Sequence, residues 1–121
     1  MANKTILVTD DSKVSRMMIS SMIKEKKDDV EIVEAENGEQ ALELIENKEI
    51  DFFSLDLNMP GIDGLTLAEK LKVKFPKAKY VLLTANIQDF TEKRSSELGI
   101  HCVHKPITEQ AIDSILEYFY G

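Results

Sequence analysis

The stretch "DFFSLDLNMPGIDG" spans residues 51–64 and joins a short apolar run to a Pro-Gly turn. The apolar run ends on Asp56, at the point where a buried strand should finish. A lone carboxylate at that depth costs free energy unless another group neutralises its charge. The groups that neutralise Asp56 must come from elsewhere in the chain, so the order of the surrounding elements decides how this acid is used.

Segments typical of strands and of helices alternate along the whole chain. Apolar and β-branched runs predict strands, and apolar residues at helical spacing behind a capping residue predict helices. We expect strands at 4–9, 30–35, 51–56, 79–85 and 100–104, and helices after Ser12, Asn37, Asp63 and Thr108 and over 86–98. Five strand–helix repeats predict a three-layer, doubly wound (βα)5 domain, in which helices cover both faces of a parallel sheet.

The apolar residues of each helix predict which side faces the sheet. The helix over 86–98 has the thinnest apolar face, so we expect it to bury the least surface. The expected inward positions are Val14, Met18 and Met22 with Ile19 and Ile23 beside them, then Ile87, Phe90 and Leu98, and finally Ile112, Ile115, Leu116 and Phe119.

Composition narrows the class of protein. The chain has 121 residues, enough for one domain, and a net charge of −7 from 15 basic and 22 acidic residues. This sign disfavours nucleic acid and anionic membranes and favours a divalent cation or a basic partner surface. Cys102 is the only cysteine, and the sequence shows neither a signal peptide nor a membrane-length apolar run. We therefore expect a soluble cytoplasmic protein.

Charged and hydroxyl side chains stand where the predicted strands end. Asp10 and Asp11 follow the first strand, Asp56 the third, Thr84 the fourth and Lys105 the fifth. In open parallel sheets the carboxyl ends of the strands share one edge, where ligands gather, so we expect these side chains to meet. Crowded carboxylates repel one another, and Mg²⁺, which takes oxygen ligands and often substrate phosphates, would relieve that repulsion.

These motifs together resemble the CheY-like receiver domain of two-component response regulators. The resemblance rests on the acidic pair after the first strand and on "LDLNMPGIDG", "LLTA" and "HKPI" in that order, and it covers residues 4 to about 120. It implies a flavodoxin-like parallel sheet of strand order 2-1-3-4-5. It also implies a single receiver domain over 1–121 with no output domain, working in chemotaxis or a phosphorelay.

The resemblance implies a role for each acid. Asp56 would be the phosphoacceptor that takes a phosphoryl group from the phosphohistidine of a histidine kinase. Asp10, Asp11 and Asp56, with the backbone carbonyl of Asn58, would hold Mg²⁺. The protein would be a signalling phosphoacceptor rather than an enzyme, catalysing only its own phosphorylation and dephosphorylation.

The remaining site residues would contact the phosphoryl group. Thr84 would bond one phosphoryl oxygen through its hydroxyl, and Lys105 would pair with another. Lys105-Pro106 matches a cis peptide of the family. Chemistry is consistent with these roles, because a carboxylate can form an acyl phosphate and phosphoryl transfer depends on groups that stabilise the equatorial oxygens.

One position departs from the family pattern. Three residues before Lys105, where many members carry a switching Tyr or Phe, this chain has Cys102. We expect output to depend on the weakly apolar fourth helix instead. The resemblance places partner binding, or a homodimer contact, on the face of the fourth helix, fifth strand and fifth helix. Residues expected on that face are Thr91, Glu92, Lys93 and Arg94.

Other functions fit the same sequence less well. A small Mg²⁺-dependent phosphohydrolase with Asp56 as nucleophile remains an alternative, although such dehalogenase-type enzymes place an acid where this chain has Asn58. A flavin binder would need an anion-friendly loop where "TDDSK" places two carboxylates. His101 and His104 should point to opposite faces of a strand, so we expect surface residues and not a metal pair.

Overall fold

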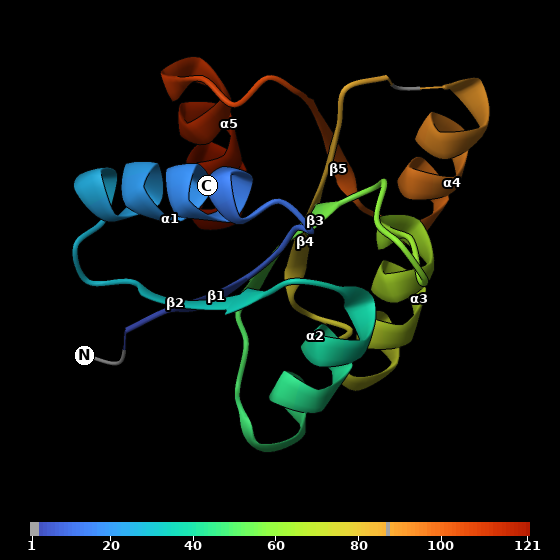
Figure 1. Ribbon diagram of the computed structural model, residues 1–121, viewed down its shortest axis with the longest axis horizontal. Helices are drawn as coiled ribbons and strands as arrows, with labels where there is room; N and C mark the ends of the chain where they lie inside the picture. Colours follow the sequence, from blue (N-terminus) through green and yellow to red (C-terminus); the bar gives the residue numbers. More distant parts are fainter. Residues whose placement is uncertain (1–2, 87) are drawn as a thin grey trace.

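Strands and helices alternate along the computed structural model, which describes residues 3–86 and 88–121, apart from the side chains of residues 89 and 90 (Figure 1). The elements are β1 Thr5–Thr9, α1 Lys13–Lys26, β2 Glu31–Ala35, α2 Gly38–Leu44, a 3-10 turn Ile45–Asn47, β3 Phe52–Asp56, α3 Gly64–Lys74, β4 Lys79–Thr84, α4 Asp89–Leu98, β5 His101–His104 and α5 Glu109–Tyr120. All neighbouring strands are parallel, in the order β2-β1-β3-β4-β5, which confirms the predicted flavodoxin-like fold. Ile87 and Phe90, expected to face inward, lie outside the described side chains.

The sheet separates two hydrophobic clusters, one under each helical layer. Alternate residues of β1 divide between them: Ile6 and Val8 join the cluster under α1 and α5, and Leu7 joins the cluster under α2 and α3. Figure 1 shows these helix pairs on opposite sides of the sheet. Every central strand is therefore buried on both faces, and only its ends remain available for polar residues.

Capping residues fix the starts of the helices where the sequence predicts them. Asn37 accepts the N–H of Gln40 at 2.8 Å, and the Gln40 side chain accepts the N–H of Glu36 at 2.6 Å, a reciprocal arrangement like a capping box. The other helix caps are Ser12, Asp63 and Thr108, each accepting a backbone N–H three residues on, and Gly99, which ends α4 at φ 73°.

The buried face of α1 differs from the prediction. Ile19 and Ile23 are fully buried, but Val14 is 68% and Met18 44% exposed, so the prediction that these two face inward is wrong. Each residue turns a helix by about 100°, and Val14 therefore lies nearly opposite Ile19 and Ile23. Val14, Met17 and Met18 together form an exposed hydrophobic surface on α1, beside the loop that follows β1. No helix of the described residues is long and apolar enough to cross a membrane.

Gly64, the first residue of α3, lies directly against the end of β3. A Cβ on Gly64 would clash with the Asp56 carbonyl oxygen and stand 2.9 Å from the carbonyl carbon and from Cδ1 of Leu82. Its N–H donates to the Leu57 carbonyl at 2.9 Å. Only glycine permits this approach, which fixes α3 against the strand that carries Asp56.

Replacing Gly64 by Ala should lower the free energy of unfolding by about 2–4 kcal/mol, because backbone must move to admit the new methyl group. Chemical denaturation measures this effect. Gly61→Ala is the matched control: Gly61 has φ 79° but open space around it, so a cost of only about 1 kcal/mol is expected. Helix propensity alone would make Gly64→Ala more stable, and a gain in stability would contradict this packing.

Candidate functional site

Three carboxylates meet where β1 and β3 end. These strands are hydrogen-bonded neighbours, so the loop after β1 brings Asp10 and Asp11 beside Asp56. One oxygen from each acid lies within 4.8 Å of the other two. Asp10 and Asp56 are buried, with exposures of 1% and 5%, whereas Asp11 is exposed. The structure thus brings the predicted acids together.

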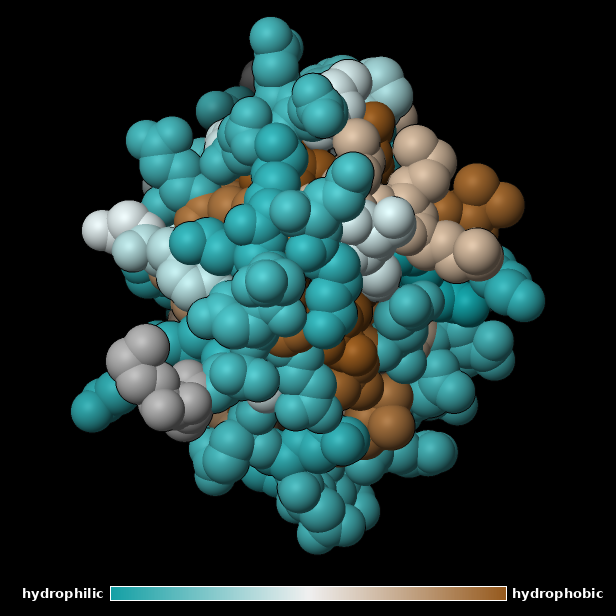
Figure 2. All heavy atoms as spheres, turned by 90° about the vertical axis from the view of Figure 1, so that its left-hand side faces the viewer, coloured by the Kyte–Doolittle hydropathy of each residue, from teal (hydrophilic) through white to brown (hydrophobic). Residues whose placement is uncertain are grey.

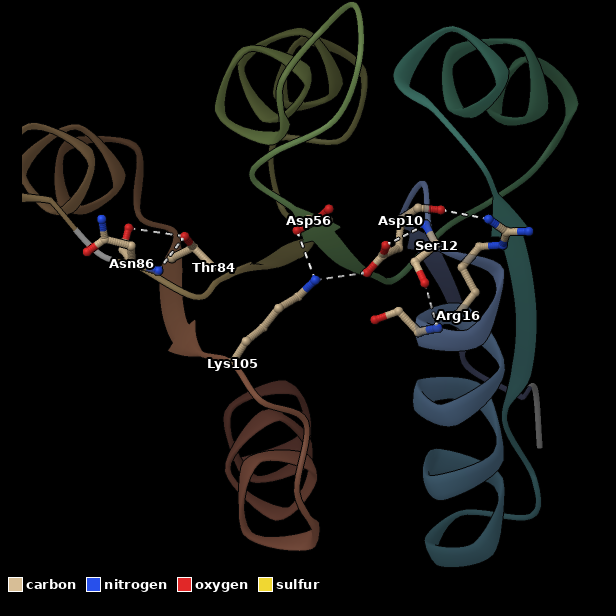
Figure 3. Close-up of polar contacts among 8 residues, drawn as sticks. Asp10, Ser12, Arg16, Asp56, Thr84, Asn86 and Lys105 are labelled. Carbon is tan, nitrogen blue, oxygen red and sulfur yellow. Dashed lines mark hydrogen bonds and ion pairs between the residues drawn. The ribbon is translucent and has the colours of Figure 1, made fainter.

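Lys105 enters this cluster from the far end of the chain. Its Nζ lies 3.1 Å from Oδ1 of Asp56 and 3.3 Å from Oδ2 of Asp10, so one ammonium group bridges two buried acids (Figure 3). The Lys105 N–H donates to the Thr84 carbonyl at 2.8 Å, and the Lys105-Pro106 peptide is cis. The predicted position of Lys105 beside the acids is confirmed.

The cluster is short of positive charge. Burial, followed by the nearby charge of Asp10, raises the pKa of Asp56 from 3.8 to about 6, although Lys105 opposes this shift. Burial alone would lower the pKa of Lys105, but the charges of Asp10 and Asp56 outweigh it and raise that pKa. One lysine therefore does not fully compensate the carboxylates, and the site favours an added cation.

The donor set suits Mg²⁺. Carboxylate oxygens are the ligands that this hard ion prefers, and it commonly binds through a few carboxylates while keeping several waters. Asp10, Asp11 and Asp56 supply three such oxygens in one cluster. Asn58 is an exposed residue that follows β3, and its carbonyl oxygen accepts no hydrogen bond from the described residues. The acids and this carbonyl would hold the ion, which would neutralise part of the negative charge of the carboxylates.

Thr84 reaches the same edge but does not contact the acids. It is fully buried at the end of β4. Its hydroxyl donates to the Asn86 carbonyl and accepts the Asn86 N–H, both at 3.2 Å. Figure 3 shows Thr84 beside Asn86 and apart from Asp56. Contact between the Thr84 hydroxyl and a phosphoryl group requires Thr84 to exchange these bonds.

Arg16 belongs to the site environment and was missed by sequence reasoning. From α1, its Nη1 donates to the carbonyl oxygen of Asp10 at 2.7 Å. The signal was present: a basic residue so near a helix N-terminus opposes the helix dipole, and such a residue calls for another reason. Ser12 also serves twice, because it caps α1 and donates its N–H to Oδ1 of Asp10 at 2.9 Å.

The α4 residues do not all lie where the resemblance placed them. Glu92 and Lys93 are exposed, but Thr91 is buried, so its predicted place on an exposed face is wrong. The guanidinium of Arg94 turns toward α3 and binds Glu69 through Nη2 at 2.9 Å and Nε at 3.0 Å. The sequence did not predict the burial of Thr91 because the side of α4 that faces the core carries hydroxyl residues, which show no apolar periodicity.

Cys102 and the two histidines lie on β5 in different surroundings. Cys102 is half-buried on β5 and packs against the cluster under α2 and α3. His101 and His104 are exposed, which agrees with the prediction of surface residues. No group of three metal-ligating residues among the described part of the chain includes either histidine.

A family model and curated proteins both match this chain. The sequence model of the response regulator receiver domain matches residues 6–117. The nitrate/nitrite response regulator protein NarL of Escherichia coli is 38% identical over 82 residues, which cover 68% of this chain and 38% of NarL. The chain therefore spans well under half the length of that relative. Sporulation initiation phosphotransferase F of Bacillus subtilis is 29% identical over 99 residues, covering 82% of this chain and 78% of the relative.

A solved structure matches over nearly the whole of both chains. The response regulator protein TrrA of Thermotoga maritima, in complex with Mg²⁺ and BeF, superposes with a TM-score of 0.82. It is 33% identical, and the match covers 96% of this chain and 98% of TrrA.

Asp56→Asn should stabilise the metal-free protein at neutral and alkaline pH. The pKa of Asp56 is about 6 in the folded chain and 3.8 ordinarily, so ionising this carboxyl costs folding free energy. That cost grows as pH rises from about 4 to about 6 and stays constant above. Asn removes it, so the gain in unfolding free energy should be up to about 3 kcal/mol at about pH 8 and vanish near pH 4.

Chemical denaturation in the presence of a chelator, repeated across this pH range, measures the difference. Glu43→Gln is the control, since Glu43 is an exposed acid in α2 remote from the cluster. Adding Mg²⁺ should then stabilise the wild type and reduce the difference in unfolding free energy between wild type and Asp56→Asn. A variant that is less stable than wild type, or a gain that does not depend on pH, would show that Asp56 is not the strained carboxylate described above.

Proposed function

The chain belongs to the response regulator receiver domain family, and on this premise we propose that Asp56 accepts a phosphoryl group in a Mg²⁺-dependent reaction. Receiver domains are phosphoacceptors in two-component signalling, and histidine kinases supply their phosphoryl groups. In this protein, Asp56, Thr84 and Lys105 would carry out the reaction, phosphorylation would control protein binding, and the protein would act in the cytoplasm. The observation that carries it is the contact of Lys105 Nζ with Asp56 at 3.1 Å, within a cluster of three acids.

The reaction uses groups already at the site. An Asp56 carboxylate oxygen attacks the phosphorus of a phosphohistidine. The new P–O bond forms as the P–N bond breaks, and the leaving imidazole nitrogen takes a proton from solvent water. Lys105 moves its ion pair from the Asp56 oxygen to a phosphoryl oxygen, which is where negative charge spreads during transfer. Thr84 contributes its hydroxyl after leaving Asn86. Mg²⁺, held by the acids and by the Asn58 carbonyl, supplies charge neutralisation when bound.

A protein phosphodonor is supported by the surface beside the acids. Val14, Met17 and Met18 are exposed on α1 and line a hollow of about 380 Å³ together with Ser21 and Met22. Figure 2 shows hydrophobic side chains gathered at the upper right of a face that is mostly hydrophilic elsewhere, apart from a hydrophobic band at its centre. Exposed apolar patches of this kind mark contact surfaces. A phosphorelay role is in keeping with the name of the Bacillus subtilis phosphotransferase, and chemotaxis stays a further prediction.

Incubation with Mg²⁺ and acetyl phosphate tests the chemistry directly. Intact mass spectrometry should show one phosphoryl adduct on the wild type, no adduct on Asp56→Asn, and no adduct on wild type in chelator. Asp113→Asn, which changes an exposed acid of α5, should label normally. An adduct that persists in Asp56→Asn would refute the assignment. Sustained release of many phosphates per chain would favour the alternative, a small phosphohydrolase with the same nucleophile.

The proposal places the moving part at α4. The core-facing strip of this helix includes the hydroxyl residues Thr91 and Ser95, both buried, and the Ser95 hydroxyl has no hydrogen-bond partner in the described structure. Movement of a helix that packs through such polar residues costs little free energy, because few stabilising contacts are lost. Asn86, which lies between β4 and α4, loses two hydrogen bonds if Thr84 turns to the phosphoryl group. The α4–β5–α5 face is thus the proposed surface for an output protein or a homodimer.

Hydrogen exchange should detect this movement. Beryllofluoride with Mg²⁺ is expected to change amide protection in peptides covering residues 84–105, because both the loop and α4 lose or exchange contacts. Peptides from α5 and β1 should change less. Asp56→Asn treated in the same way is the control, and light scattering on the same samples tells whether a homodimer forms. Identical protection of 84–105 with and without the mimic would exclude α4 as the output element.

A further inference from the structure

The two acids after β1 are held in very different ways. Asp10 is buried, and its carboxylate accepts bonds from the Ser12 N–H at 2.9 Å and from Lys105 at 3.3 Å. Asp11 is exposed, and its carboxylate has neither a hydrogen bond nor an ion pair to any of the described residues. The position of the Asp11 carboxylate therefore depends on its backbone.

Arg16 holds that backbone from α1. Its Nη1 donates to the carbonyl oxygen of Asp10 at 2.7 Å, while its Nε donates to Oε1 of Glu34 on β2 at 3.3 Å (Figure 3 shows the first contact). The other Glu34 oxygen accepts the Ser20 hydroxyl at 3.2 Å. Only 13% of the Arg16 side chain is exposed, and its contact with the Asp10 carbonyl is partly buried, whereas the Glu34 side chain is 39% exposed.

The carbonyl that Arg16 contacts belongs to the peptide unit that leads into Asp11. A peptide unit is planar, so fixing its carbonyl oxygen also fixes the direction of the Asp11 N–H and the place of its Cα. The other end of Asp10 is fixed too, because its N–H donates to the Ala35 carbonyl at 3.1 Å. The backbone that presents Asp11 is thus tied to both α1 and β2.

We propose that Arg16 is a positioning residue for the metal site, acting through the Asp10 carbonyl to aim Asp11 at a bound divalent cation. This inference rests on the proposed Mg²⁺-dependent function. Arginine fits the task because its planar fork donates to a carbonyl and to a carboxylate at once, whereas lysine offers a single point of charge. Groups that orient metal ligands commonly change metal affinity by ten-fold or more when removed.

Electrostatics alone predicts the opposite change in Mg²⁺ affinity, so the direction of the change distinguishes the two explanations. A positive charge close to a cation site, at the start of a helix, repels the cation, and so its removal alone would tighten Mg²⁺ binding. Removal of the backbone contact should instead weaken it. Lys13 is a matched control: it is an exposed cation in the first turn of the same helix, with no ion pair among the described residues.

Mg²⁺ titration by calorimetry on the full chain, for wild type, Arg16→Gln, Arg16→Lys and Lys13→Gln, tests the inference. Arg16→Gln should raise the Mg²⁺ dissociation constant about ten-fold. Arg16→Lys, which keeps a donor for the carbonyl but lacks the planar fork that also binds Glu34, should bind Mg²⁺ with an affinity between those of wild type and Arg16→Gln. Lys13→Gln should bind Mg²⁺ as tightly as wild type or more tightly. The phosphorylation rate of Arg16→Gln should recover at saturating Mg²⁺, which a general loss of structure would not allow.

Two results would overturn the inference, and they are distinguishable. If wild type binds Mg²⁺ and Arg16→Gln binds it as tightly or more tightly, Arg16 does not position Asp11, while the proposed function stands. If wild type itself binds no Mg²⁺, both the inference and the proposed function fail. Should Arg16→Gln unfold, Glu34→Gln weakens the same anchor, and an unchanged affinity in that variant would also count against the inference.

Discussion

Asp56 carries a charge that its own surroundings do not fully compensate. The acid lies at the end of a strand buried on both faces, with two other carboxylates near it and one lysine in contact. Burial and the charge of Asp10 raise its pKa to about 6, so the metal-free site stores unfavourable electrostatic energy. A cation, and then a phosphoryl group that engages Lys105, would each relieve part of that energy. The site is therefore sensitive to the two species that a phosphoacceptor has to recognise.

The fold makes this crowding possible and keeps it in place. Parallel strands deliver Asp10, Asp56 and Lys105 to one edge from positions up to 95 residues apart. Close contacts then prevent the site from relaxing: Gly64 admits α3 against the carbonyl of Asp56, and Arg16 ties the first loop to α1 and β2. On the β4 side, the Thr84 hydroxyl bonds, among the described residues, only to Asn86, which leads into a helix with a polar core-facing strip. A rigid acid cluster thus adjoins a loosely held element.

Features set by neighbouring residues were predictable from the sequence. The bond between Asn37 and Gln40 and the turn at Gly99 each depend on a few consecutive residues, and the meeting of the strand-end acids follows from a parallel sheet. Predictions that needed the rotation of a helix failed. Val14 and Met18 share the spacing of a buried face, yet packing of Ile19 and Ile23 turned them outward. Arg16 was missed because the local signal, a basic residue near a helix N-terminus, does not record its contacts with the Asp10 carbonyl and with Glu34 on β2.

A structure of the chain crystallised with Mg²⁺ and beryllofluoride tests the central claim most directly. The account predicts one metal ion held by Asp10, Asp11, Asp56 and the Asn58 carbonyl. The fluoride group on Asp56 should contact Lys105 and a Thr84 hydroxyl that has turned away from Asn86. A metal bound elsewhere, or Lys105 unmoved beside an unmodified Asp56 at saturating concentrations, would contradict it.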